Sequence, residues 1–127
     1  MTRRIWLIDD TPVLHAVAAA TVERAGGWEF TGYLSGAEAL RDLDAGTPWP
    51  EVILMDYYIG AERGDRVTSQ LRSREPATIR PVIVGYSSVR SASQTIVAAG
   101  ADLIVPKHQD DEGINPSLLA YLRRWAG

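Results

Sequence analysis

The 127-residue chain contains no cysteine. Disulfides, zinc–thiolate sites and thiol chemistry are therefore excluded. The chain also lacks any apolar run close to the ~20 residues that a membrane-spanning helix needs. Its first residues, Met1-Thr2-Arg3-Arg4, lead into a strand-like run and do not have the pattern of a signal peptide. These absences favour a cytoplasmic protein with no membrane partner.

Positive charge is in short supply as well. The chain has 13 Lys and Arg against 16 Asp and Glu, for a net charge of −3. Binding to nucleic-acid phosphates requires clustered Lys and Arg, so direct nucleic-acid binding is not expected. Internal repeats, low-complexity runs and linkers are absent too, and the length is that of one domain with one core. We expect a single domain over residues 1–127, without an output domain.

Short β-branched runs alternate along the chain with segments of helical periodicity. The pattern predicts strands over residues 4–9, 29–34, 52–56, 82–86 and 103–105. It predicts helices over 12–25, from the Ser35 cap to just before Gly46, over 65–74 and 91–99, and from Pro116 onward. Five such β–α units indicate an α/β fold, with a parallel sheet covered by helices on both faces.

Local signals set several of these boundaries. Thr11 is a candidate N-cap before Pro12, although Asp10 could fill that role, and Gly26-Gly27 would end the helix. Ser35 and Glu38 have the spacing of a capping box. After the third strand, glycines punctuate the segment 60–64, which predicts a loop.

Charged residues follow three of the predicted strands directly. Asp9 and Asp10 follow the first, Asp56 the third, and Lys107 the fifth. The carboxyl ends of parallel strands share one edge of the sheet, where ligands bind in open α/β folds. Carboxylates crowded there repel one another unless a cation or a proton joins them. Mg²⁺ is the natural occupant because it prefers oxygen ligands and retains several waters.

The order of these residues resembles the response-regulator receiver domain, in the superfamily of the chemotaxis regulators of two-component signalling. The resemblance covers essentially the whole chain and rests on five features, none of them specific alone: Asp9-Asp10, Asp56, Ser87, Gly100-Ala101 and Lys107. It implies a flavodoxin-like (βα)5 fold with strand order 2-1-3-4-5. It also implies Mg²⁺-dependent phosphoryl transfer from the phosphohistidine of a histidine kinase to an aspartate.

Carried over residue by residue, the resemblance makes Asp56 the phosphorylation site and a metal ligand. Asp10 would bind Mg²⁺ directly, Asp9 through a water, and Tyr58 through its backbone carbonyl. Lys107 would pair with Asp56 at rest and with the phosphoryl oxygens afterwards. Phosphoryl transfer depends mainly on alignment and charge neutralisation, which a metal ion and an ammonium group supply.

The resemblance also implies a switch residue after the fourth strand. Ser87 would donate its hydroxyl to the phosphoryl group and draw the following loop inward, which would change the surface of the domain. Counting from Pro81 places Tyr86 at that position instead. We prefer Ser87 because a short hydroxyl must follow the phosphoryl group over a small distance.

The chain departs from the family pattern around the lysine. Pro106-Lys107-His108 replaces the usual Lys-Pro order, so no cis peptide is expected after Lys107. Ile104 stands where the family often has an aromatic residue, which removes an aromatic switch there and leaves Tyr86 as a substitute. The interval between Ser87 and Gly100 is also short, which indicates either a trimmed loop or a late start of the fourth helix.

Other functions agree less well with the residues. A flavin carrier would need a Ser, Thr or Gly-rich phosphate loop where the chain has Asp9-Asp10-Thr11-Pro12. A phosphatase of the haloacid-dehalogenase type would have Asp-x-Asp after the first strand. The alternative that stays open is a receiver-like interaction module that works without phosphorylation.

We therefore expect a signalling phosphoacceptor rather than a turnover enzyme. Such a protein would catalyse only its own phosphorylation and dephosphorylation. Its partners would be a sensor histidine kinase or phosphotransfer protein, and a downstream effector or output domain. A homodimer through the last helices stays open, as does the choice between a stand-alone regulator and part of a longer protein.

Overall fold

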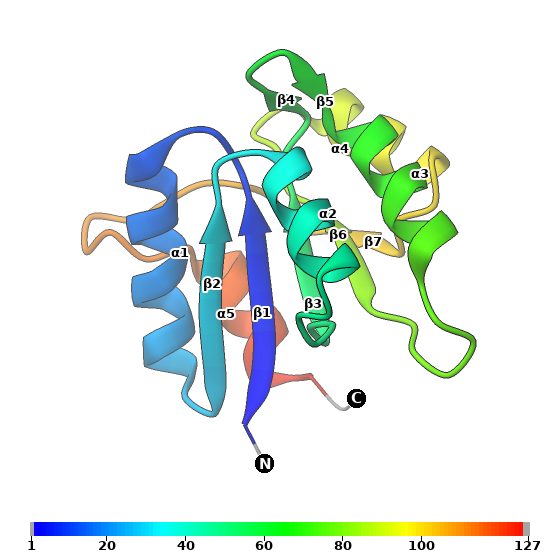
Figure 1. Ribbon diagram of the computed structural model, residues 1–127. Helices are drawn as coiled ribbons and strands as arrows, with labels where there is room; N and C mark the ends of the chain where they lie inside the picture. The colour runs from blue at the N-terminus through cyan, green and yellow to red at the C-terminus, as the bar shows by residue number, and fades with distance from the viewer. Residues whose placement is uncertain (1, 126–127) are drawn as a thin grey trace.

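The computed structural model describes residues 2–125 and contains one five-stranded sheet, in which neighbouring strands are parallel (Figure 1). The strand order is β2-β1-β3-β6-β7, which confirms the predicted order 2-1-3-4-5. Its strands are β1 (Arg3–Ile8), β2 (Trp28–Tyr33), β3 (Val52–Met55), β6 (Val82–Gly85) and β7 (Leu103–Ile104). The predicted α/β class and the flavodoxin-like (βα)5 arrangement are therefore correct.

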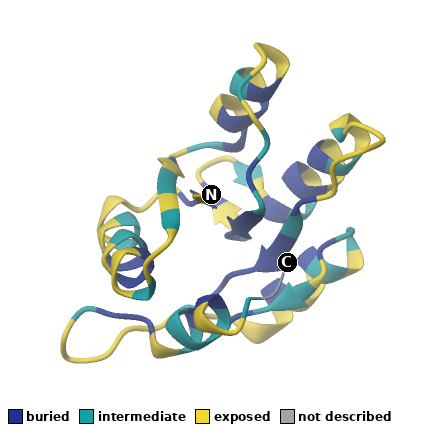
Figure 2. Ribbon diagram, turned by 90° about the horizontal axis from the view of Figure 1, so that it is seen from below, coloured by how far each residue is buried: buried dark blue, intermediate teal, exposed yellow. Residues whose placement is uncertain are grey.

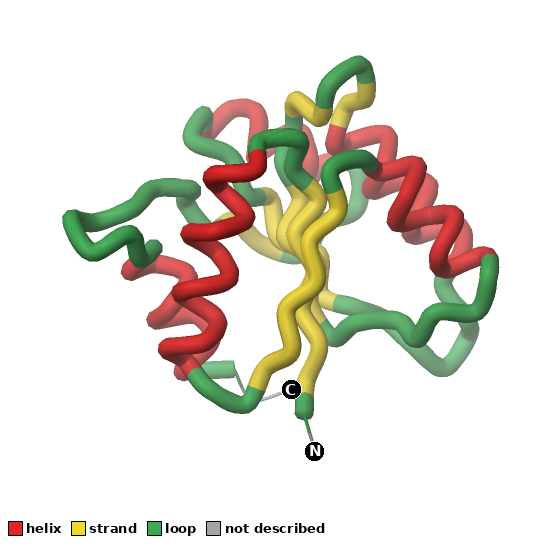
Figure 3. The backbone as a smooth tube through the Cα atoms, turned by 60° about the vertical axis from the view of Figure 1, so that its left-hand side comes forward, coloured by secondary structure: helices red, strands yellow, loops and turns green. Residues whose placement is uncertain are grey.

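Helices cover both faces of the sheet (Figure 3). One face packs against α1 (Pro12–Ala25) and α5 (Pro116–Arg123). The other packs against α2 (Gly36–Asp44), α3 (Gly64–Arg74) and α4 (Arg90–Ala98). The helices therefore leave the amino ends and the carboxyl ends of the strands uncovered.

The central strands are buried from both sides, as Figure 2 shows by their dark blue colour. In β1, Ile5 and Leu7 belong to the core beneath α1 and α5, whereas Trp6 and Ile8 belong to the core on the opposite face. Since side chains alternate along a strand, a strand covered on both faces is apolar throughout. This explains why continuous apolar runs, and not alternating ones, marked these strands.

A short antiparallel hairpin occupies the segment that was predicted to be a loop. It consists of β4 (Tyr58–Ile59) and β5 (Glu62–Arg63), with Tyr58 paired to Arg63 and Ile59 to Glu62. Gly60 has a φ of +61°, a value that glycine adopts at little cost in a tight turn. Ile59 is 2% exposed and belongs to the core, so the hairpin is anchored to the domain.

The helix boundaries largely agree with the prediction. Helix α1 has the predicted bounds, but Thr11 at its N-cap position makes no side-chain capping bond. At α2, Ser35 accepts a hydrogen bond from the Glu38 backbone N–H, as the capping box predicted. Helix α4 begins at Arg90, so the short interval after Ser87 reflects a trimmed loop.

Two further predictions concern the whole described segment. Residues 2–125 contain no cis peptide bond, in agreement with the expectation for Lys107-His108. Within the same segment, no helix combines the length and the apolar character that crossing a membrane requires.

Candidate functional site

Three charged side chains from three strand ends meet at the carboxyl edge of the sheet. Lys107 donates from Nζ to Asp9 Oδ2 at 3.0 Å and to Asp56 Oδ1 at 2.9 Å. Asp9 is fully buried and Asp56 is 7% exposed. The backbone N–H of Asp9 donates to Tyr33 O and that of Asp56 to Ile8 O, so both acids continue the sheet ladder. The sheet register itself therefore brings the two acids together.

The electrostatics of this cluster are unfavourable for the Asp56 carboxylate. Burial raises the pKa of Asp56 above its ordinary value, and the neighbouring Asp9 charge raises it further. The hydrogen bond and the charge of Lys107 act in the opposite direction, but they do not cancel the effect of burial on that pKa. Two acids facing one ammonium group leave a surplus of negative charge at this edge.

Asp10 completes an acidic triad with a geometry suited to a hard cation. Carboxylate oxygens of Asp9, Asp10 and Asp56 lie within 4.8 Å of one another. Asp10 is exposed, and its Oδ2 accepts a hydrogen bond from the Gly60 backbone N–H at 2.9 Å. An all-oxygen donor set with one solvent-facing member fits Mg²⁺ or a similar divalent ion, which binds through carboxylates and keeps waters.

The two candidate switch residues point their hydroxyl groups to different partners. Tyr86 is 1% exposed, and its hydroxyl accepts a hydrogen bond from Asn115 Nδ2 at 2.8 Å. Burial raises the pKa of Tyr86 to about 12. Ser87 is 7% exposed, and its Oγ accepts from the Val89 backbone N–H at 3.1 Å. Tyr86 thus faces the core below α5, whereas Ser87 holds the start of the loop before α4.

Tyr58, the predicted carbonyl ligand, begins β4 two residues after Asp56. Its side chain is exposed and packs edge-on against Tyr57, with ring centroids 4.7 Å apart. Gly64 closes the base of the hairpin by donating to Tyr57 O at 2.7 Å. A Cβ on Gly64 would lie 1.8 Å from Asp56 O, so glycine is required for this close approach of the backbone.

His15 and His108 both serve packing or local hydrogen bonds. His15 Nε2 lies 2.6 Å from Asp9 O, and because a carbonyl only accepts, this nitrogen carries the proton. The ring fills the space above Gly32, where a Cβ would collide with His15. His108 Nε2 contacts Ser117 Oγ at 2.9 Å.

Two polar residues near the site were not predicted from the sequence. Asn115 is fully buried and caps α5, and Asn immediately before Pro116 is a recognisable N-cap signal. Glu62 accepts hydrogen bonds from Gly36 N and Ala37 N at the start of α2. No local pattern marks Glu62, because its partners lie 25 and 26 residues away.

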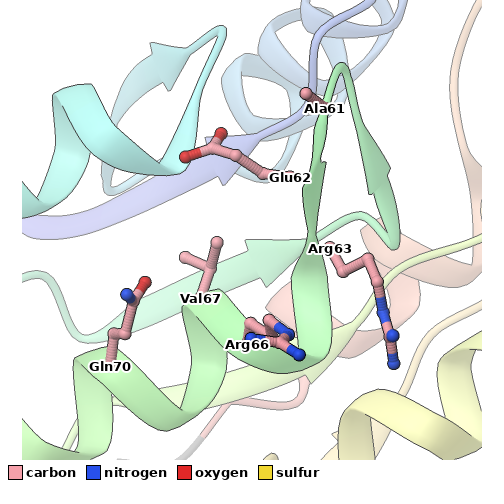
Figure 4. A pocket seen from close by; sticks show the side chains of 6 residues that line it. All are labelled: Ala61, Glu62, Arg63, Arg66, Val67 and Gln70. Carbon is pink, nitrogen blue, oxygen red and sulfur yellow. The ribbon is translucent and has the colours of Figure 1, made fainter.

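A hollow of about 380 Å³ lies beside the hairpin, away from the acidic cluster. Figure 4 shows Glu62 directed toward α2 while Arg63 lies on the other side of the strand. The hollow is lined by residues of the hairpin and of the first turns of α3: Ala61, Glu62, Arg63, Arg66, Val67 and Gln70. The acids that carry the candidate chemistry are not among these lining residues.

Comparison with known proteins gives one consistent result. The family model described as "Response regulator receiver domain" matches residues 5–118. A curated relative, the protein-glutamate methylesterase/protein-glutamine glutaminase 3 of Hahella chejuensis, is 29% identical over 126 residues. That match covers 94% of this chain but only 35% of the relative, so the chain spans about a third of the relative's length.

Several solved structures of similar fold are described as response regulators. The Mn²⁺-bound form of the response regulator Rcp1 has a TM-score of 0.79 at 14% identity, over 97% of this chain and 94% of that one. The DrrB response regulator of Thermotoga maritima has a TM-score of 0.74 at 20% identity, over 98% and 52%.

A response regulator from Burkholderia pseudomallei, with a phosphorylated aspartic acid, a calcium ion and citrate, has a TM-score of 0.72 at 25% identity. That match covers 96% of this chain and 67% of the other.

Proposed function

Because this chain belongs to the response regulator receiver family, we propose that it accepts a phosphoryl group on Asp56 and signals through a change of its surface. The proposal rests above all on one observation. Lys107 Nζ bridges Asp9 and Asp56 at 3.0 and 2.9 Å on a buried edge of the sheet. A carboxylate, a second acid and an ammonium group in contact are the parts that phosphoryl transfer to an aspartate needs.

In the proposed reaction an Asp56 carboxylate oxygen attacks phosphorus. A new O–P bond forms as the P–N bond of the donor phosphohistidine breaks, and the electron pair of that bond stays on the imidazole nitrogen. Lys107 holds the Asp56 carboxylate in one orientation before the reaction and neutralises negative charge on the phosphoryl oxygens after it. Because Asp56 is buried beside Asp9, solvent screens the charges in this site only weakly, and the neutralisation by Lys107 is therefore strong.

The acidic triad would hold the divalent ion. Asp10 and Asp56 would bind it directly, Asp9 through a water molecule, and Tyr58 through its backbone carbonyl. When bound, Mg²⁺ supplies positive charge to the transferring phosphoryl oxygens. The solved relatives with Mn²⁺ and with calcium support a divalent ion of this kind here.

Ser87 remains our proposal for the residue that transmits phosphorylation. Its Oγ accepts from Val89 N at the start of that loop, so its own hydroxyl hydrogen can donate to the phosphoryl group and carry the loop with it. Tyr86 is the less suitable candidate, because its hydroxyl is fixed by Asn115 in the core. The partners would be a sensor histidine kinase or a phosphotransfer protein, together with a downstream effector protein or output domain.

The test is intact mass spectrometry after incubation with acetyl phosphate and Mg²⁺. We expect one adduct of ~80 Da, the mass of a phosphoryl group, which disappears in Asp56→Asn and in the absence of metal. If neither acetyl phosphate nor a panel of phosphorylated kinases yields the adduct in the wild type, the protein functions as an interaction module without phosphorylation.

A further inference from the structure

A buried hydrogen-bond network connects the candidate site to the start of α5. Its centre is Asn115, which is fully buried and makes more contacts than a cap requires. The Asn115 Oδ1 accepts from Ser117 N and Leu118 N at 3.0 and 3.1 Å, which caps the helix. The side-chain nitrogen Nδ2 points the other way, toward residues that follow β6 and β7.

Both amide hydrogens of Asn115 are used on the side of the site. Nδ2 donates to Tyr86 Oη at 2.8 Å and to Pro106 O at 3.0 Å. The backbone N–H of Asn115 donates to Thr21 Oγ1 at 3.0 Å, which ties the network to α1. Every side-chain donor and acceptor of this asparagine is therefore engaged, which is how a buried polar group holds one orientation.

The contact with Pro106 bears directly on Lys107. The Pro106 carbonyl and the Lys107 N–H belong to the same planar peptide unit. Asn115 holds the carbonyl end of this unit, and the Lys107 N–H donates to Ser87 O at 3.4 Å at the other end. Holding both ends of this peptide plane restrains where the Lys107 Cα lies, and therefore the point from which the Lys107 side chain leaves the backbone.

The surrounding backbone offers few other restraints at this point. Val105 N donates to Gly85 O, and two residues further along only the longer bond from Lys107 N to Ser87 O continues this ladder. Pro106 has no N–H to donate. From there the chain runs through a polar loop before it returns at Asn115, and Asp110 Oδ1 stabilises that loop by accepting from Glu112 N and Ile114 N.

We propose that Asn115 is a positioning residue, which aims the Lys107 ammonium group at Asp9 and Asp56 through the Pro106 carbonyl. This role rests on the proposed phosphoacceptor function for its chemical consequence, but its geometric part exists in the resting protein.

The test uses Asn115→Ser as the central variant. Serine is as good an N-cap as asparagine, so α5 keeps its cap while the amide donor to Pro106 is lost. Leu122→Val provides a control, because it disturbs the buried packing of α5 without touching the network. Tyr86→Phe provides a second, because it removes one acceptor of Asn115 and leaves the Pro106 contact.

Two measurements are made on each variant: the ¹⁵Nζ resonance of Lys107 by NMR in the resting protein, and the rate of phosphorylation by acetyl phosphate with Mg²⁺. In the wild type we expect a protected Lys107 ammonium signal, which Asn115→Ser removes and both controls retain. The phosphorylation rate of Asn115→Ser should fall on the order of tenfold, as expected when a reacting group is misplaced. In a Lys107→Ala background the same substitution should have no further effect.

Two results would overturn the positioning role: an unchanged Lys107 signal in Asn115→Ser, or a rate loss that adds fully to that of Lys107→Ala. The failure of the proposed function has a different signature. A wild-type protein that takes no phosphoryl group contradicts the function, while the Lys107 resonance still decides whether Asn115 positions the lysine.

Discussion

At the scale of single residues, the site carries an electrostatic cost that the rest of the fold must offset. Asp56 is buried next to a second acid, and burial raises the pKa of Asp56 above its ordinary value of 3.8. A carboxyl group whose pKa is higher in the folded state makes folding less favourable once it ionises. Unfavourable charge of this kind is common where a side chain is kept for chemistry.

Asp56→Asn should therefore increase the free energy of unfolding at pH 7 in the absence of divalent ions. Below pH 3.8 both the folded and the unfolded wild type bind the proton, so the ionic cost vanishes and the variant should lose its advantage. The cost develops as the pH rises through the raised pKa of the folded state. Urea denaturation in EDTA at a series of pH values measures this. An advantage of the variant that stays constant down to pH 3 would contradict it.

The acids and the lysine of the site could be found from the sequence, whereas the network behind them could not. Asp9, Asp56 and Lys107 follow apolar runs, and parallel strands deliver their carboxyl ends to one edge wherever the helices lie. Asn115 is different, because its role depends on Tyr86 and Pro106, which approach it only after α5 has docked. The aromatic switch considered for Tyr86 stays a prediction, and in the resting protein Asn115 donates to its hydroxyl in the core.

At the scale of elements, the β4–β5 hairpin is connected to two other parts of the edge. Glu62 in β5 accepts hydrogen bonds from Gly36 N and Ala37 N at 2.8 and 2.9 Å, where α2 begins. Gly60 in the turn donates to Asp10. Since two-residue strands show no periodicity, the sequence predicted only a loop here. The hairpin depends on these distant partners and on the close approach of Gly64 to Asp56.

Glu62→Ala should lower the free energy of unfolding by about 1 kcal/mol, the usual cost of losing a charged cap at a helix N-terminus. Glu62→Gln keeps one acceptor oxygen and should lose less. Glu112→Ala is the matched control, because that glutamate pairs with Arg24 on the surface at 3.3 Å and should change stability by less than about 0.5 kcal/mol. Urea denaturation of the three variants gives the comparison. Equal losses in Glu62→Ala and Glu112→Ala would argue against a capping role.

At the scale of the whole molecule, the two ends of the sheet differ in their electrostatics. At the amino end of the strands, Arg72 donates to Glu75 and Asp102 and to the carbonyls of Pro81 and Gly100. Arg80 also pairs with Glu75 and Asp102, so charges of opposite sign alternate in this network. The carboxyl end instead collects three acids around one lysine. The paired charges at the amino end therefore stabilise the fold, whereas the surplus of acids at the carboxyl end can be stabilised by a bound cation.

Mg²⁺ should therefore stabilise the whole domain, because the triad exists only when β1 and β3 are paired. A ligand that binds the folded state alone adds about 2.7 kcal/mol to the free energy of unfolding at a hundred times its Kd. We expect the melting temperature to rise with Mg²⁺ until the site saturates, and Asp10→Asn to need much higher Mg²⁺ for the same rise. Asp111→Asn, in the exposed loop before α5, should behave like the wild type. Thermal unfolding across a Mg²⁺ series decides this, since an undiminished response in Asp10→Asn would locate the ion away from the triad.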